Sequence, residues 1–185
     1  MFSTSTREGA AIHAADHHKD LPKNLRFMVI VTSDTIVAAK EKGEPCQDIS
    51  GDVAISLIAS HGFKVSKRIY LPNRLDAILK ETKSGTASGS NDVVIIIGGT
   101  GLSRRDVSVE AVSPLFEKHI PGFGEIFRHL SYGAVGTSAI ASRATAGVLN
   151  GTLVFILPGS PEAVKMALEQ IVIPEAPHLI KMVRG

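Results

Sequence analysis

Short apolar runs alternate with segments of helical spacing from residue 25 onward. Apolar runs at 27–31, 93–97 and 152–157 and the mixed segment at 64–71 predict four strands. The β-branched run 93–97 is typical of a parallel strand that is buried on both faces. These runs are the expected centre of a sheet.

Between the runs, apolar residues recur every three or four positions, which is the spacing of an amphipathic helix. We expect helices within residues 53–61, 75–79, 108–118, 122–130, 138–146 and 161–171, and loops at 32–51 and 83–91. Gly62 is expected to end the first helix, and Ser160 to cap the helix that begins at Pro161. Alternating strands and helices predict a single-domain α/β fold with a doubly wound, mostly parallel sheet and helices on both faces.

The first 24 residues differ from the rest of the chain. They are rich in Ser, Thr, Ala and His and show no periodic apolar face. We expect residues 1–24 to be a flexible N-terminal extension and residues 25–185 to be the α/β domain. The extension's histidines, His13, His17 and His18, are either metal ligands or part of a solvated tail.

Composition excludes several classes of function. The chain has 185 residues, 44% of them apolar, and a net charge of +2. It has no basic run with interleaved aromatics, so nucleic acid is not an expected partner. It also has no apolar stretch of the ~20 residues that a membrane helix needs and no signal-peptide core. One cysteine, Cys46, excludes an internal disulfide and fits the cytoplasm.

The strand at 93–97 runs directly into Gly98-Gly99-Thr100-Gly101, and Asp106 follows. Glycines let the backbone turn sharply and bring its N–H groups close to a ligand. Such a loop before a helix is a natural seat for a phosphate, and an adjacent acid suits a divalent metal. The alternative is a tight turn without a ligand.

Two further strands end in small or polar loops, Thr32-Ser33-Asp34 and Pro158-Gly159-Ser160-Pro161. In an open α/β sheet, ligands bind outside the carboxyl ends of the strands. Three such loops on one rim predict a wide polar crevice for a multiply phosphorylated ligand. Their spacing matches neither a P-loop nor a dinucleotide fingerprint.

Charged and hydroxyl side chains near these loops leave two interpretations open. Asp34, Asp48 and Asp106 either hold Mg²⁺ for phosphoryl or nucleotidyl transfer or, for Asp48 and Asp106, cap the helices that follow. The arginines that suit a phosphate are Arg104, Arg105 and Arg143, and the alternative for Arg104 and Arg105 is a solvated loop charge. The hydroxyls that suit a ligand are Ser131, Ser138 and Ser142, and the alternative for Ser142 is packing inside a helix.

An ordered set of motifs resembles the MoaB/Mog family of molybdenum cofactor biosynthesis proteins. The motifs are Asp48-Ile49-Ser50-Gly51, Gly98–Gly101 with Arg105-Asp106, Pro121-Gly122-Phe123-Gly124-Glu125, Ser142-Arg143-Ala144 and Leu157-Pro158-Gly159-Ser160-Pro161. The match covers residues 25–185. Gly101-Leu102 and the stretches 114–116 and 126–128 are closer to MoaB than to Mog.

The resemblance implies a cytoplasmic enzyme with a molybdopterin-binding fold that adenylylates molybdopterin, using Mg²⁺ and ATP and releasing pyrophosphate. It further implies a homotrimer or homohexamer. The implied catalytic residues are Asp106 and Asp48, with Asp106 also the metal ligand. The implied substrate-binding residues are Ser33, Asp34, Ser50, Gly51, Gly98, Gly99, Thr100, Gly101, Ser142, Arg143, Pro158, Gly159, Ser160 and Pro161.

The chain departs from the family pattern at Asn73. Catalytically competent members similar to Mog have a Pro-Asp pair where this chain has Pro72-Asn73. An amide does not supply the negative charge of a carboxylate. Asp76 lies three residues on, about one helical turn away, and is not expected to replace it. The alternative function is a non-catalytic molybdopterin-binding oligomer of the same pathway.

Overall fold

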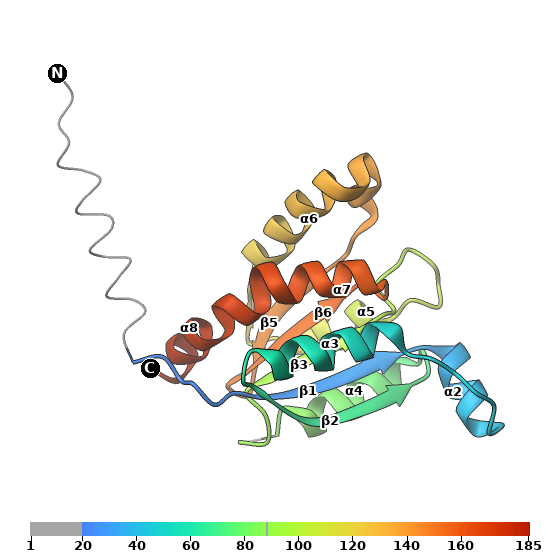
Figure 1. Ribbon diagram of the computed structural model, residues 1–185, viewed down its shortest axis with the longest axis horizontal. Helices are drawn as coiled ribbons and strands as arrows, with labels where there is room; N and C mark the ends of the chain where they lie inside the picture. The colour runs from blue at the N-terminus through green and yellow to red at the C-terminus, as the bar shows by residue number, and fades with distance from the viewer. Residues whose placement is uncertain (1–19, 88) are drawn as a thin grey trace.

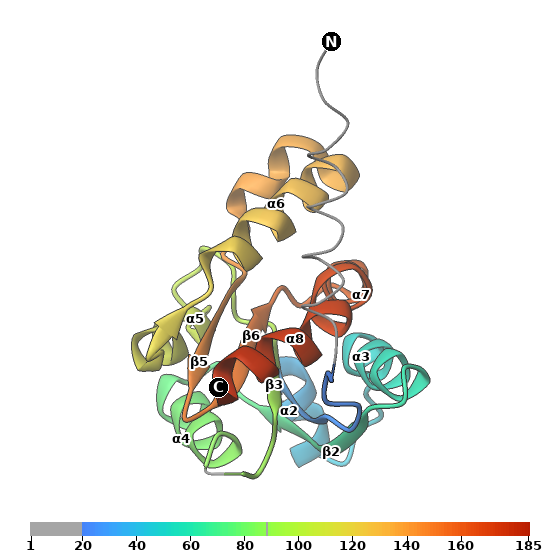
Figure 2. The ribbon, with the colours of Figure 1, turned by 90° about the vertical axis from the view of Figure 1, so that its left-hand side faces the viewer.

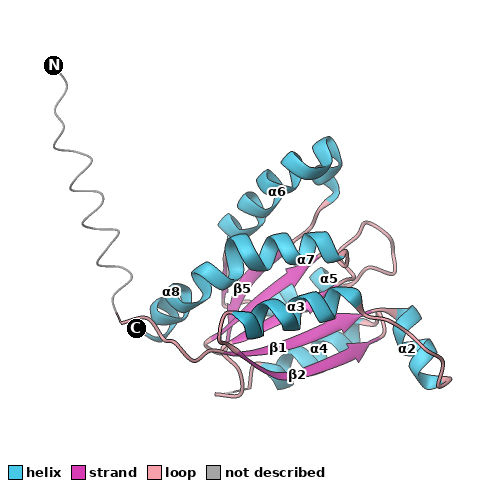
Figure 3. Cartoon of the chain, viewed as in Figure 1, coloured by secondary structure: helices cyan, strands magenta, loops and turns pink. Residues whose placement is uncertain are grey.

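The computed structural model describes residues 20–87 and 89–185, which fold around one sheet (Figures 1 and 3). The strands are β1 (Arg26–Thr32), β2 (Lys64–Leu71), β3 (Val93–Ile97), β4 (Lys118–His119), β5 (Thr145–Leu149) and β6 (Thr152–Leu157). Their order across the sheet is β2-β1-β3-β6-β5-β4. The first four in this order are parallel, whereas β5 runs antiparallel to β6, and β4 runs antiparallel to β5. The predicted α/β fold with a mostly parallel sheet is confirmed.

Helices cover both faces of this sheet. They are α2 (Asp34–Glu41), α3 (Ile49–Ser60), α4 (Leu75–Gly85), α5 (Ser108–Val112), α6 (Pro121–Val135), α7 (Pro161–Ala167) and α8 (Ile173–Arg184). Short 3₁₀ turns form η1 (Ser113–Leu115) and η2 (Gly136–Ala141), and a π-helical turn, η3 (Leu168–Val172), joins α7 to α8. Figure 2 shows α4 and α5 on one side of the sheet and α3 and α7 on the other, with α6 projecting beyond the sheet.

Two apolar cores lie on opposite faces of the sheet, because successive side chains of a strand point to opposite faces. In β3, Ile95 joins the core formed with α3, α6, α7 and α8. The next residue, Ile96, joins the core formed with α4 and α5. Both residues are fully buried. This explains the unbroken apolar run of β3.

The expected helix at 138–146 is wrong. The η2 turn ends at Ala141, and Thr145 already begins β5. Asn150 and Gly151 then form a two-residue turn into β6, with positive φ angles of 51° and 72°. An Asn-Gly pair between apolar runs is the signal of this type of hairpin. The sequence therefore carried evidence for β5 that a helical interpretation of the segment overlooks.

Other element boundaries also differ from expectation. Within the expected loop at 32–51, the chain forms α2; this helix has no buried residue, so no apolar stripe marks it. The helix expected at 108–118 ends at Val112, and Pro114 lies in the η1 turn that follows. In the other direction, α4 extends to Gly85, inside the expected loop at 83–91.

The predicted N-terminal extension lies almost wholly outside the described residues, and its three histidines lie entirely outside them. Those expectations stay predictions. Among the residues described, no helix has the length and apolar character needed to cross a bilayer.

Candidate functional site

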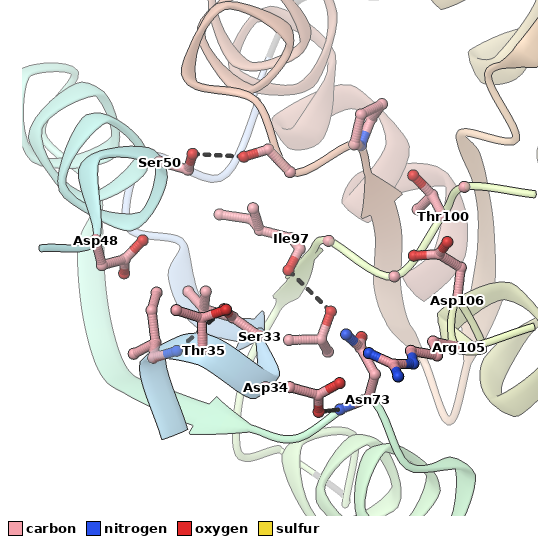
Figure 4. A pocket seen from close by; sticks show the side chains of 18 of the residues that line it. Ser33, Asp34, Thr35, Asp48, Ser50, Asn73, Ile97, Thr100, Arg105 and Asp106 are labelled. Atoms are coloured by element: carbon pink, nitrogen blue, oxygen red, sulfur yellow. Dashed lines mark hydrogen bonds between the residues drawn. The ribbon is translucent and has the colours of Figure 1, made fainter. Parts of the chain in front are cut away.

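The carboxyl ends of four strands meet at one edge of the sheet, because these strands are parallel and in register. Val31 of β1 lies opposite Ile97 of β3, which lies opposite Leu157 of β6. On the other side of β1, Thr32 lies opposite Leu71 of β2. The segments that follow the four strands therefore lie side by side, around a cavity of about 850 Å³ (Figure 4).

Most of the predicted site residues line this cavity. They are Ser33, Asp34, Asp48, Ser50, Gly98, Gly99, Thr100, Gly101, Asp106, Pro158, Gly159 and Pro161. The other four of the predicted set, which lie outside its lining, are Gly51, Ser142, Arg143 and Ser160. The convergence of three polar loops on one rim is confirmed, whereas the ligand that each residue binds stays a prediction.

The loop after β3 approaches its neighbours so closely that it requires glycine. Gly98 and Gly99 have φ angles of +98° and +64°, which residues with a Cβ rarely adopt. A Cβ on Gly98 would lie 2.6 Å from the Thr32 carbonyl oxygen, and one on Gly99 would lie 2.3 Å from Ser108 Oγ. The Gly98 amide also donates to the Leu157 carbonyl at 2.9 Å. The loop backbone is thus packed between β1 and β6 at the cavity.

Two residues that line the cavity, Ser33 and Asp48, are helix caps. Ser33 caps α2 by accepting a hydrogen bond from the Ile36 amide, and Asp48 caps α3 by accepting one from the Gly51 amide at 2.8 Å. Helix N-termini carry unpaired N–H groups and partial positive charge, so both favour a bound anion. Gly51 does not line the cavity, but it leaves room for the Asp48 side chain to cap α3, since a Cβ on Gly51 would lie 1.9 Å from Asp48 Oδ2.

Asp48 has a structural role that its neighbours define. Its side chain is 7% exposed and forms an ion pair with Arg68 of β2 at 3.3 Å. Arg68 also pairs with Asp52 at 2.6 Å. The interpretation of Asp48 as a cap is confirmed, and the role of Arg68 was missed. No local pattern marks Arg68, because it lies 20 residues from Asp48 in the chain.

Asp106 has a different environment. The helix α5 has Val107 as its N-cap and no side-chain hydrogen bond at the cap, so the interpretation of Asp106 as a cap is wrong. Its carboxylate lies against Gly101, where a Cβ would come within 2.7 Å of Oδ2. Figure 4 shows Asp106 beside Thr100, at the cavity.

The Asp106 carboxylate fits a Mg²⁺ that is shared with a ligand. No hydrogen bond from the described part of the chain occupies it. Within residues 20–87 and 89–185, no group of three or more His, Cys, Asp or Glu side chains is arranged to hold a metal alone. Mg²⁺ keeps several waters and commonly binds through one or two carboxylates and substrate phosphates. The Asp106 carboxylate at the edge of the cavity matches that kind of site.

Asn73 also lines the cavity, which supports the importance of its departure from the family pattern. Its backbone amide donates to Asp34 Oδ1 at 2.8 Å, while its own Oδ1 is buried and has no hydrogen-bond partner among the described residues. Figure 4 shows Asp34, Asn73 and Arg105 close together. Asp76 pairs with Arg74 at 2.6 Å and is not part of the lining, as expected.

The opposite wall of the cavity comes from the loop between β6 and α7. Ser50 Oγ donates to the Gly159 carbonyl at 2.6 Å, which ties this loop to α3. Ser160 caps α7 by accepting a hydrogen bond from the Ala163 amide, as predicted. The Ser160 oxygen therefore serves as a helix cap beside the cavity.

A second cavity, of about 300 Å³, adjoins the first and shares Pro158 with it. It lies between α6, η2 and α7. Its walls are mostly apolar, with Phe127 and Met166 among them. All three serines that the sequence singled out as donors, Ser131, Ser138 and Ser142, line this second cavity instead of the first.

A family model described as "Probable molybdopterin binding domain" matches residues 28–178. Molybdenum cofactor biosynthesis protein B from Bacillus subtilis (strain 168) is 40% identical over 170 residues, which cover 91% of this chain and 96% of that protein. The protein of the same name from Staphylococcus epidermidis is 40% identical over 174 residues, covering 91% and 95%.

Solved structures agree with these relatives. A crystal structure of molybdenum cofactor biosynthesis protein B has a TM-score of 0.79 at 34% identity, covering 88% of this chain and 98% of that chain. The tungsten cofactor synthesizing protein MoaB from Pyrococcus furiosus has a TM-score of 0.74 at 38% identity, covering 89% and 99%. A MogA structure shares the fold, with a TM-score of 0.73 at 24% identity. This chain is thus more similar in sequence to these MoaB structures than to that of MogA.

Proposed function

This chain belongs to the family of probable molybdopterin binding domains and to molybdenum cofactor biosynthesis, and on that premise we propose that it adenylylates molybdopterin with Mg²⁺ and ATP. The observation that carries the proposal is the cavity. The glycine loop, the N-termini of α2 and α3 and the Asp106 carboxylate all border one space. Donors for several phosphates and a ligand for a divalent cation are therefore within reach of one substrate pair.

In the proposed reaction, an oxygen of the terminal phosphate of molybdopterin attacks the α-phosphorus of ATP. A new P–O bond forms, the bond from the α-phosphorus to the bridging oxygen breaks, and pyrophosphate leaves. Phosphoryl chemistry of this kind depends mainly on positioning and on neutralising charge. The backbone of residues 99–101 and the two helix N-termini border the cavity, which supports a role for their N–H groups in holding and orienting phosphates.

Asp106 is the residue proposed to hold Mg²⁺ together with the phosphates, and Asp34 is a second carboxylate that lines the same cavity. The cation supplies neutralisation of the charge on the phosphates. Asp48 is proposed to have a supporting role, since its side chain caps α3 and fixes where that helix begins. Ser50 holds the loop between β6 and α7 in place through its hydrogen bond to the Gly159 carbonyl.

Turnover tests this function directly. Purified protein is mixed with molybdopterin, ATP and Mg²⁺, and adenylylated molybdopterin and pyrophosphate are measured together. Equal amounts of both products over many cycles are expected. Molybdopterin binding without either product would instead support the non-catalytic alternative, which the amide of Asn73 at the cavity favours. Failure to bind molybdopterin would contradict both.

Replacing Asn73 by Asp is expected to raise kcat on the order of tenfold, because one added charge–phosphate or charge–cation contact of about 1.4 kcal/mol corresponds to that factor. The new carboxylate replaces a buried amide oxygen that has no hydrogen-bond partner among the described residues. Pyrophosphate release at several Mg²⁺ concentrations measures the effect. Asp76→Glu, a change at the exposed pair with Arg74, is the control and is expected to have no effect. An unchanged kcat in Asn73→Asp would show that charge at residue 73 does not limit the reaction.

We also propose that the chain forms a homo-oligomer through α6 and η2. These elements project from the body of the protein and carry exposed apolar side chains, Tyr132, Val135 and Ile140, the last 89% exposed (Figure 2). Contiguous exposed apolar groups mark interaction surfaces. A mass of three or six chains by light scattering is expected, with a shift toward the monomer in Ile140→Glu. Met182→Glu, at exposed Met182 of α8, is the control, and a monomeric wild type would contradict the proposal.

A further inference from the structure

Arg143 lies outside the cavity, and its guanidinium is used within the protein. Nε donates to the Thr100 carbonyl at 3.1 Å, and Nη2 donates to the Asp106 carbonyl at 3.2 Å. The same guanidinium forms an ion pair with Glu110 of α5, with Nη2 3.3 Å from Oε2. This hydrogen bonding holds the pKa of Glu110 below its ordinary value. Three segments are thus joined at one side chain.

The two carbonyls stand on either side of an exposed tip. Residues 98–107, here called the β3–α5 loop, connect β3 to α5. Within this loop, residues 102–105 are exposed, Leu102 by 76%. The tip has its own short contacts, since the Asp106 amide donates to the Ser103 carbonyl at 3.0 Å. Arg143 therefore bridges the two ends of this tip through its contacts with both carbonyls.

The position of Asp106 follows from this contact. The carbonyl and the side chain of a residue leave neighbouring backbone atoms in different directions. Arg143 holds the Asp106 carbonyl, while the carboxylate of the same residue lies against Gly101 at the cavity. The Asp106 carboxylate has no hydrogen bond of its own from the described residues to hold it there. Its position therefore depends on the backbone that carries it.

We propose that Arg143 is a positioning residue, which acts through the β3–α5 loop and sets the place of the Asp106 carboxylate. The proposal rests on the function proposed above for Asp106, and it differs from the substrate-binding role that the sequence predicts for Arg143. Arginine suits the task because its planar fork donates in several fixed directions. Lysine keeps the charge but presents a single ammonium group, so it does not reproduce the contacts with Thr100, Asp106 and Glu110.

Two measurements on the full-length protein test the proposal. Amide hydrogen exchange at Asp106 and Ser108, whose amides donate to the Ser103 and Gly99 carbonyls, reports the order of the loop. In Arg143→Lys, exchange at these amides is expected to accelerate on the order of tenfold, as hydrogen bonds to two loop carbonyls are lost. The kcat for adenylylation is expected to fall about 10- to 100-fold, with little change in KM, since misplacing a group by about 1 Å has effects of that size.

Two control variants separate this role from others. Glu110→Gln removes the charge of the ion pair but keeps an oxygen acceptor, so exchange and kcat are expected to stay near the wild-type values. Arg184→Lys changes an arginine–carboxylate contact with Asp92 at the other end of β3, and leaves exchange in the loop unchanged.

Three results would overturn the proposal. Wild-type amide exchange in Arg143→Lys would show that the β3–α5 loop does not need the contacts of Arg143. A rise in KM with normal kcat and normal exchange would make Arg143 a substrate contact. Equal effects in Glu110→Gln and Arg143→Lys would assign the positioning to the ion pair. If the wild type forms no product, the proposed function fails, while the exchange data still decide whether Arg143 orders the loop.

Discussion

Asp106→Asn is expected to reduce adenylylation by at least about 10²-fold, the size of effect seen when one electrostatic contact to a reacting group is removed. The amide is nearly the same size as the carboxylate but does not carry the charge proposed to hold Mg²⁺ against the phosphates. Folding is expected to change little, because Asp106 does not cap α5 and its carboxylate makes no hydrogen bond within the described chain. A shift in melting temperature of less than about 2 °C is expected for a change of this kind.

Pyrophosphate release and thermal melting, measured on the same preparations, check this result. Asp76→Asn is the matched control, since Asp76 lies in the first turn of α4, is exposed and pairs only with Arg74 among the described contacts. It is expected to keep full activity. An active Asp106→Asn would remove the carboxylate from the mechanism. A variant that loses its fold would instead show that Asp106 is a structural residue.

Gly99→Ala is expected to destabilise the protein by about 2–4 kcal/mol, which combines the cost of a Cβ at positive φ with that of overpacking. The new Cβ would lie 2.3 Å from Ser108 Oγ and 2.8 Å from Asn73 Oδ1, so both side chains must move. The melting temperature is expected to fall by about 5–15 °C. Activity is expected to fall as well, because Asn73 and Gly99 both line the cavity.

Gly151→Ala separates the two contributions. Gly151 also has a positive φ, +72°, but a Cβ there meets no heavy atom within 4 Å. This control is expected to lose only the conformational contribution, about 1 kcal/mol. Thermal and denaturant unfolding of both variants measures the difference. Equal destabilisation would show that the close approach of the β3–α5 loop to Ser108 and Asn73 does not limit stability.

Much of the fold was predictable from local patterns. The run 93–97 predicts β3 because a strand buried on both faces must be apolar at every position, and β3 is buried throughout. Ser160 before Pro161 likewise predicts the start of α7. The strand at 145–149 was missed, and its first two residues were included in the helix expected at 138–146, because its apolar pattern is short and the pairing that makes it a strand lies in β6.

The candidate site was predictable at the level of loops, but not of contacts. Parallel strands bring their carboxyl ends to one edge, so Ser33, Gly98 and Pro158 were expected to converge, and the strand register confirms it. The same reasoning does not distinguish a cap from a free carboxylate. Only the structure shows that Asp48 caps α3 and that Asp106 caps no helix.

Local patterns in the sequence predict the four parallel strands, the order of the central motifs and the family, because each depends on residues that are close together in the chain or occur in a fixed order. The tertiary structure alone decided where single side chains are used. Arg143 follows η2, yet its guanidinium meets the Thr100 carbonyl, 43 residues earlier in the chain. Such contacts depend on how whole elements pack against one another, and a periodicity within one element carries no information about the direction of a side chain toward a distant loop.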